Sequence, residues 1–293
     1  AAGVGGLVSG AVAGRSRGTL AVVGGVPRLG KVPGRGPGRA HKAVHAAIFG
    51  STDPDRLITL ARAYPGWAGL CYLMAGLLCH SHGGHLRAAE LLQLGIAVGN
   101  DEDANRYASA YLTGVITRAE VAERIEVPVL FSEEAVFLAL SHSLRETGQT
   151  EAALAALTGL PPSLPSALAR CSLAAGLRRD AEVAADTEGL LNGDDLAAAL
   201  LLIRARSLWR LGGYGAARAA LQEVLRRRKT DFTLRSDALT DLALLLLDNG
   251  RKSLNRRGWQ HTSPAEMETV TAIGKDADLH ELWDREFGQA DGG

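Results

Sequence analysis

Three shortages in the sequence narrow the class of protein that it encodes. Cysteine occurs three times in 293 residues, and this small, odd number argues against a disulfide framework. No run of apolar residues reaches the ~18 positions that a membrane-spanning helix requires. Complete motifs for nucleophilic catalysis, such as G-x-S-x-G, are absent. We therefore expect a soluble, cytoplasmic protein with reduced thiols.

Acidic residues are absent from the first 52 positions, which hold seven of the 32 basic residues. The rest of the chain carries the other 25 basic residues against all 32 acids, so the two parts have formal charges near +7 and −7. Glycine and proline are frequent in the same segment (GKVPGRGPGRA), which cannot bury enough apolar surface to offset the entropy of ordering. We predict that residues 1–50 form a disordered leader. Association of this leader with nucleic acid is an alternative that we favour less.

From residue 66 onward, Ala, Leu, Glu and Arg dominate with helical periodicity, and strand signals are nearly absent. A small turn residue, an alanine five positions later and a large apolar residue nine positions later recur at Gly83/Ala88/Leu92, Gly148/Ala153/Leu157 and Gly212/Ala217/Leu221. The separations of 65 and 64 residues are about two periods of 33, and further copies start at Arg178 and Gly250. A small residue lies seven positions before each turn, where antiparallel helices would approach: Gly76, Ser141, Cys171, Ala205 and Ala243.

These residues resemble the tetratricopeptide-repeat family, most clearly in SLWRLGGYGAARAALQEVL, where Gly212, Tyr214, Ala217 and Leu221 occupy motif positions. The resemblance implies an all-α, tetratricopeptide-like solenoid of antiparallel helix pairs, which we assign to residues 51–260. The sequence Ser263-Pro264-Ala265-Glu266 is a strong helix start, so we expect capping helices over residues 261–293.

Residues 115–131 interrupt the helical pattern. Apolar positions such as Val121 and Val127 alternate there with charged ones such as Glu126. Alternation with a period of two predicts a small β-hairpin inserted between helices, with Pro128 on an edge strand.

The segment CHSHGGH, residues 79–85, holds one thiol and three imidazoles within seven residues. In the repeat register, it forms the end of one helix, a turn and the start of the next helix. Cys79 should point inward and His80 outward, whereas a metal site needs three or four ligands that converge. We therefore predict a structural turn that binds no metal or cofactor. The alternative is a metal-dependent enzyme that uses His80, His82 and His85.

The pattern G-x-x-x-x-G-K at residues 25–31 is an incomplete phosphate-binding loop, because Val32 stands where a magnesium-binding hydroxyl is required. The tetratricopeptide resemblance implies adaptors and assembly scaffolds instead of enzymes. We predict a non-enzymatic scaffold that binds a protein or peptide partner in the concave groove of the solenoid.

Residues two, three and six positions before a turn should face this groove, whereas Leu208, four positions before Gly212, should lie in the core. The expected peptide-binding residues are His80, His142, Arg145, Arg206, Trp209 and Arg210. An aromatic side chain among arginines suits an extended peptide that carries carboxylates. We therefore expect an acidic partner.

Overall fold

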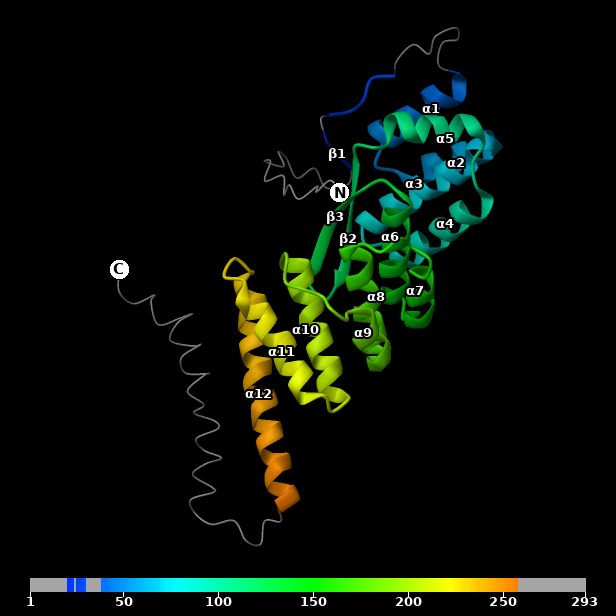
Figure 1. The fold of residues 1–293 in the computed structure, drawn as a ribbon. Helices are drawn as coiled ribbons and strands as arrows, with labels where there is room; N and C mark the ends of the chain where they lie inside the picture. The colour runs from blue at the N-terminus through cyan, green and yellow to red at the C-terminus, as the bar shows by residue number, and fades with distance from the viewer. Residues whose placement is uncertain (1–19, 24, 30–37, 258–293) are drawn as a thin grey trace. The chain divides into compact units, whose positions relative to one another are not determined.

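The computed structural model describes residues 20–23, 25–29 and 38–257, and Figure 1 shows that they form helices and one small sheet. The predicted fold class, all-α with a small β insertion, is confirmed. The chain divides into two compact units, Ala1–Leu157 and Thr158–Gly293. Each unit is described by itself below.

The first unit contains seven α-helices among its described residues, a short 3-10 helix (Pro65–Trp67) and three strands. The helices are α1 Arg39–Gly50, α2 Pro54–Ala63, α3 Ala68–Ser81, α4 His85–Val98, α5 Glu102–Tyr111, α6 Glu133–Glu146 and α7 Thr150–Ala156. The strands are β1 Ala21–Val22, β2 Val115–Ala122 and β3 Ile125–Leu130. Side-chain oxygens of Asp53, Asp101 and Ser132 cap α2, α5 and α6, which fixes where these helices begin.

Helices α3 and α4 form the most closely packed pair of the first unit. Helix α3 is apolar around most of its circumference, as expected for a buried helix. Gly76 lies at the contact, and a Cβ atom there would lie 2.7 Å from Cγ of Leu92. Gly95 of α4 has the same role, since its Cβ would lie 2.8 Å from Cδ2 of Leu73. The small residue predicted before the first turn therefore lets the two backbones approach.

Four helical hairpins among the described residues share one turn geometry. Gly83, Gly148 and Gly212 have φ of 77°, 79° and 81°, and Arg178 takes the same left-handed conformation at 60°. In each turn, the next residue donates its N–H to the carbonyl five positions earlier, as from Gly84 to Cys79 at 2.9 Å. This is the hydrogen bond of a Schellman-type helix end. The turns predicted at these four positions are confirmed.

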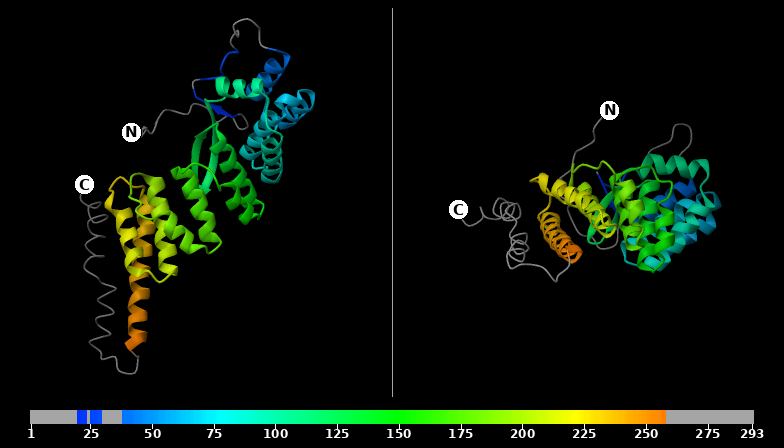
Figure 2. Two further views of the ribbon diagram at one scale, coloured as in Figure 1. Left: turned by 45° about the vertical axis from the view of Figure 1, so that its right-hand side comes forward. Right: turned by 60° about the horizontal axis from the view of Figure 1, so that its bottom comes forward.

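The sheet has the order β1-β2-β3 and is antiparallel throughout (Figure 2). The predicted hairpin is present, with Pro128 opposite Arg118 on the edge strand β3. The register shifts between Glu120 and Ala122. Strand β1 lies in the segment that was predicted to be disordered, and it pairs Val22 with Val115 of β2.

The prediction that residues 1–50 are disordered is wrong for residues 39–50, which form α1. Val44, Ala47 and Ile48 of this helix are buried. His45 Nδ1 lies 2.9 Å from the hydroxyl of Tyr107, and the His41 ring packs edge-on against Trp67. The segment before residue 39 is rich in glycine and proline, and its composition led to the prediction of disorder for all of residues 1–50, including this short apolar helix. Residues 1–19, 24 and 30–37 lie outside the described part.

The second unit contains helices α8 Leu164–Gly176, α9 Asp180–Asp186, α10 Asp195–Arg210, α11 Tyr214–Arg226 and α12 Phe232–Arg257. Helices α10, α11 and α12 share one core that includes Leu201, Leu221 and Leu242. The turn predicted at Gly250 is wrong, because α12 continues through this glycine. A single glycine inside a helix costs only about 1 kcal/mol, which the rest of a long helix offsets. The predicted capping helices at 261–293 lie outside the described residues.

None of the helices in the described ranges combines the length and the apolar character that crossing a membrane requires.

Candidate functional site

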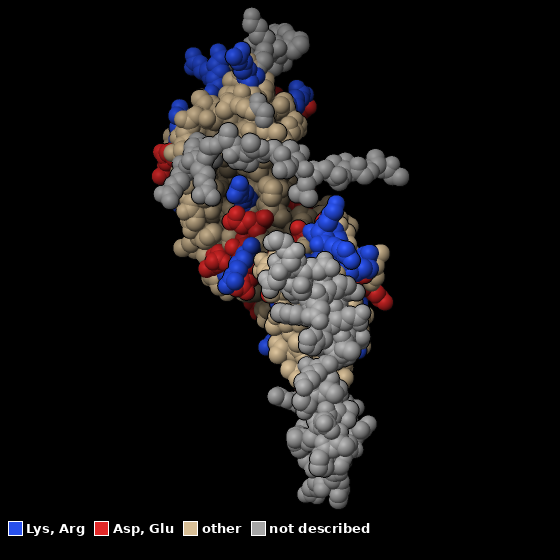
Figure 3. Space-filling model, turned by 90° about the vertical axis from the view of Figure 1, so that its left-hand side faces the viewer, with Lys and Arg blue, Asp and Glu red and all other residues tan. Residues whose placement is uncertain are grey.

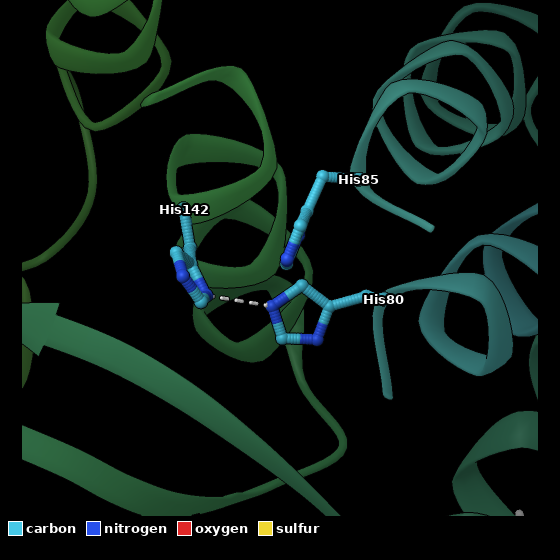
Figure 4. Close-up of side chains that lie close together, drawn as sticks. All are labelled: His80, His85 and His142. Atoms are coloured by element: carbon cyan, nitrogen blue, oxygen red, sulfur yellow. Dashed lines mark hydrogen bonds between the residues drawn. The ribbon is translucent and has the colours of Figure 1, made fainter. Parts of the chain in front are cut away.

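Three histidines from three helices of the first unit meet at one point (Figure 4). His80 lies in the last turn of α3, His85 is the first residue of α4, and His142 comes from α6. Nε2 of His80 lies 3.0 Å from Nδ1 of His142, and one ring nitrogen of each residue lies within 4.8 Å of the other two. The ring centres are 5.0–5.7 Å apart. The arrangement is a three-imidazole cluster.

The repeat turn places two members of this cluster. The left-handed residue Gly83 reverses the chain between α3 and α4, which brings His85 beside His80. Packing of α6 against α3 and α4 adds His142 from 62 residues away. The expectation that His80 points outward is wrong, since only 6% of this residue is exposed. His82 is exposed and is not a member of the cluster.

Burial favours the neutral form of these imidazoles. Burial, together with the charges of protonated His142 and His85, lowers the pKa of His80 to about 3. Burial also lowers the pKa of His142, with the charge of Arg145 acting in the same direction. His80 and His142 are therefore uncharged at neutral pH. Nδ1 of His80 and Nδ1 of His85 are buried without a hydrogen-bond partner.

Charged residues surround His142 on its far side. Glu146 Oε1 lies 3.7 Å from His142 Nε2, one helical turn along α6. Arg145 donates from Nη2 to Glu146 at 3.0 Å and to Glu120 of β2 at 2.9 Å. The bond from Arg145 lowers the pKa of Glu146. The β insertion thus supplies a carboxylate, that of Glu120, which fixes the side chain of Arg145. Arg145 is a member of the predicted peptide-binding set.

The other three predicted peptide-binding residues lie on α10 in the second unit, and acids of the same unit pair with both arginines. Arg206 donates from Nε to Asp241 at 2.6 Å. Arg210 donates from Nε to both carboxylate oxygens of Asp180, at 3.0 and 2.9 Å. This pairing lowers the pKa of Asp180. On the face drawn in Figure 3, basic and acidic side chains lie side by side.

Trp209 is half-buried and packs against the core of α10, α11 and α12. Its Nε1 donates to Asp248 at 2.9 Å, and the Tyr214 hydroxyl donates to the same carboxylate oxygen at 3.0 Å. Leu208 packs partly buried against the same core. The repeat register predicts a buried Leu208 and a Trp209 that faces an open groove. In the structure, both side chains are partly buried against the same core, so the predicted difference in burial is small.

The structure thus brings together His80 and His142, with Arg145 beside them, and keeps Arg206, Trp209 and Arg210 together on one helix. The alternative metal site of the sequence analysis grouped His85 with His80 but included His82 in place of His142. The histidine-rich segment was a signal for two of the three residues. His142 stands alone in SHSLRE, so only tertiary packing assigns it to the site.

No family model matches the sequence, and no curated protein matches it. Among solved structures, the chain is similar to the N-terminal domain of EccA1 ATPase from the ESX-1 secretion system of Mycobacterium tuberculosis. The identity is 14%, the similarity covers 81% of this chain and 86% of that chain, and the TM-score is 0.47. A likeness at this level says nothing of function.

Proposed function

We propose that the protein is a non-enzymatic interaction scaffold built from tetratricopeptide-like repeats, which binds a partner protein or peptide. The observation that carries this proposal is the set of helical hairpins with one shared left-handed turn. Arrays of such hairpins present successive first helices to a partner and need no catalytic group. Three buried, free cysteines support a location in a reducing compartment such as the cytoplasm.

The face of α10 is the part of the second unit best suited to an acidic peptide. The side chain of Arg206 is 45% exposed although it contacts Asp241, so a partner carboxylate has access to its guanidinium. Arg210 is held bidentately by the buried Asp180 and has less freedom to change partner. Arg206 is therefore the residue whose loss should affect binding with the least effect on folding.

The test measures fluorescence anisotropy of synthetic extended peptides that differ only in their number of carboxylates. Arg206→Ala should weaken binding of the most acidic peptide at least fivefold, about 1 kcal/mol, as for other arginine anchors. Arg226→Ala is the matched control, because Arg226 is an exposed arginine of α11 that pairs with Glu223 of its own helix. Added salt should also weaken the binding.

Equal loss of affinity in both variants would contradict a specific role for α10. Binding that does not depend on the number of carboxylates would contradict an acidic partner. Tighter binding of a single-stranded oligonucleotide than of any peptide would favour the nucleic-acid alternative instead.

A further inference from the structure

We infer that His80, His85 and His142 form a binding site for one divalent transition-metal ion of the zinc type. Neutral imidazole is a preferred ligand of zinc and of neighbouring first-row metals, whereas magnesium and calcium prefer oxygen ligands. The three side chains come from α3, α4 and α6, so this site differs from the local cluster of His80, His82 and His85 that the sequence suggested.

The separations between the rings agree with tetrahedral coordination. Zinc–nitrogen bonds of about 2.0–2.1 Å place two ligand nitrogens about 3.3 Å apart across a tetrahedral angle. The observed separations range from 3.0 Å, between His80 and His142, to at most 4.8 Å. Ring centres in such a site lie about 5.2 Å apart. The three observed values of 5.0, 5.1 and 5.7 Å fall close to this distance.

The ring nitrogens have few other interactions. The contact between His80 and His142 accounts for one nitrogen of each ring. Figure 4 shows the nitrogen-bearing end of the His85 ring directed toward the other two rings, and Nδ1 of His85 is buried without a partner. Buried polar atoms in proteins nearly always have a partner. An ion at the meeting point would provide a partner for the His85 nitrogen directed there, and it would replace the direct contact between His80 and His142.

The local charges also favour a cation. Glu120 and Glu146 adjoin Arg145 beside His142, so the three groups sum to one negative charge. The 3.7 Å approach of Glu146 to the far nitrogen of His142 resembles the carboxylate–histidine pairing that orients metal ligands. With three protein ligands, the fourth tetrahedral position is left to water.

A bound ion would cross-link the α3–α4 hairpin to α6 within the first unit. Ligands that bind only the folded state raise its stability, so zinc should raise the thermal unfolding temperature of the protein. This effect is independent of peptide binding by α10, and it tests the site without assuming any catalytic activity.

The experiment titrates zinc chloride into the metal-free full-length chain by calorimetry, with magnesium chloride as the control ion. We expect about one zinc ion per chain and no measurable magnesium binding. His142→Gln and His85→Gln should each weaken zinc binding more than about 100-fold, because loss of a second-shell partner alone costs 10- to 100-fold. His82→Gln is the matched control, because His82 is exposed on the same turn, and it should bind zinc like the wild type.

Circular dichroism establishes that each variant is folded, and if His142→Gln unfolds, the half-buried His85 carries the same test. The inference is overturned if the wild type binds no zinc. It is also overturned if His142→Gln or His85→Gln binds zinc as tightly as the wild type, or if His82→Gln loses zinc, since the ion would then bind elsewhere. A zinc-induced rise in unfolding temperature should appear in the wild type and in His82→Gln alone.

Discussion

Arg178 is one of two non-glycine residues, with Arg124, that have a left-handed backbone conformation in the described part of the chain. It occupies the position that glycine holds in the three equivalent turns, with φ of 60°. For a residue with a Cβ atom, the left-handed conformation costs about 1–2 kcal/mol, and glycine avoids this cost. The exposed arginine side chain makes the substitution to glycine possible without loss of packing.

We predict that Arg178→Gly raises the free energy of unfolding by about 0.5–1 kcal/mol. Relief of the left-handed strain should exceed the extra backbone entropy that glycine brings to the unfolded chain. Urea denaturation checks this value. Arg179→Gly is the matched control, since Arg179 is also exposed but has an ordinary φ of −83°, and it should lower stability. A similar gain in both variants would exclude backbone strain as the cause.

At the scale of single residues, the sequence predicts positions that local geometry determines. Gly83, Gly148 and Gly212 were recognisable because glycine is the residue that tolerates a left-handed turn. The histidine cluster was not predictable, because His142 comes from a distant helix. The direction of a side chain at a helix end depends on the neighbouring helix, which explains why His80 was expected outside and lies inside.

At the scale of helices, the contact between α3 and α4 depends on the absence of a side chain at Gly76. Glycine in a helix interior normally disfavours the helix, so alanine would be stabilising if space were available. Here the added Cβ would lie too close to both the side chain and the backbone nitrogen of Leu92. Leu92 is fully buried, so it has no free space into which to move. The helices must therefore separate to accept a methyl group.

We predict that Gly76→Ala lowers the free energy of unfolding by about 1–3 kcal/mol through overpacking. Gly176→Ala is the matched control, because Gly176 lies in α8 with nothing within 4 Å of its added Cβ. It should raise stability by about 0.5–1 kcal/mol through helix propensity. Thermal unfolding of both variants gives the comparison. Stabilisation by Gly76→Ala would contradict the prediction, because it would show that the α3–α4 contact accepts a methyl group.

Elements were predictable where periodicity persists over their whole length. The alternation of apolar and charged residues identified β2 and β3, including the edge position of Pro128. Strand β1 has only two residues, too few for any periodic signal. At Gly250, the sequence predicts a turn but α12 continues, because nothing in the local sequence distinguishes a glycine at a helix end from one inside a helix.

At the scale of the molecule, the leader contributes to the core of the first unit. Val44 and Ala47 are fully buried in α1, and β1 extends the sheet by pairing with β2. The hydrogen bond between His45 and Tyr107 connects α1 to α5. These contacts contradict the expectation that the whole segment is a solvated extension.

We predict that removal of residues 1–47 lowers the free energy of unfolding by at least about 2 kcal/mol, because a buried valine alone contributes about 1.5–3 kcal/mol. Removal of residues 1–19 is the control, since β1 and α1 remain in that shortened chain. Denaturant unfolding followed by circular dichroism compares the two with the full chain. Equal stability of the full chain and both shortened chains would show that the packing of α1 does not contribute to the free energy of unfolding.

The β3 edge of the small sheet is a poor template for another strand, because β3 contains Pro128, which has no N–H to donate. On the other side, β1 pairs only with Val115 and Ile116 and so covers one end of β2. Exposed edges are the usual starting points of aggregation and the usual sites where extended peptides bind by strand addition. Pro128 thus weakens the β3 edge as a site for edge-to-edge self-association and for peptide binding by strand addition.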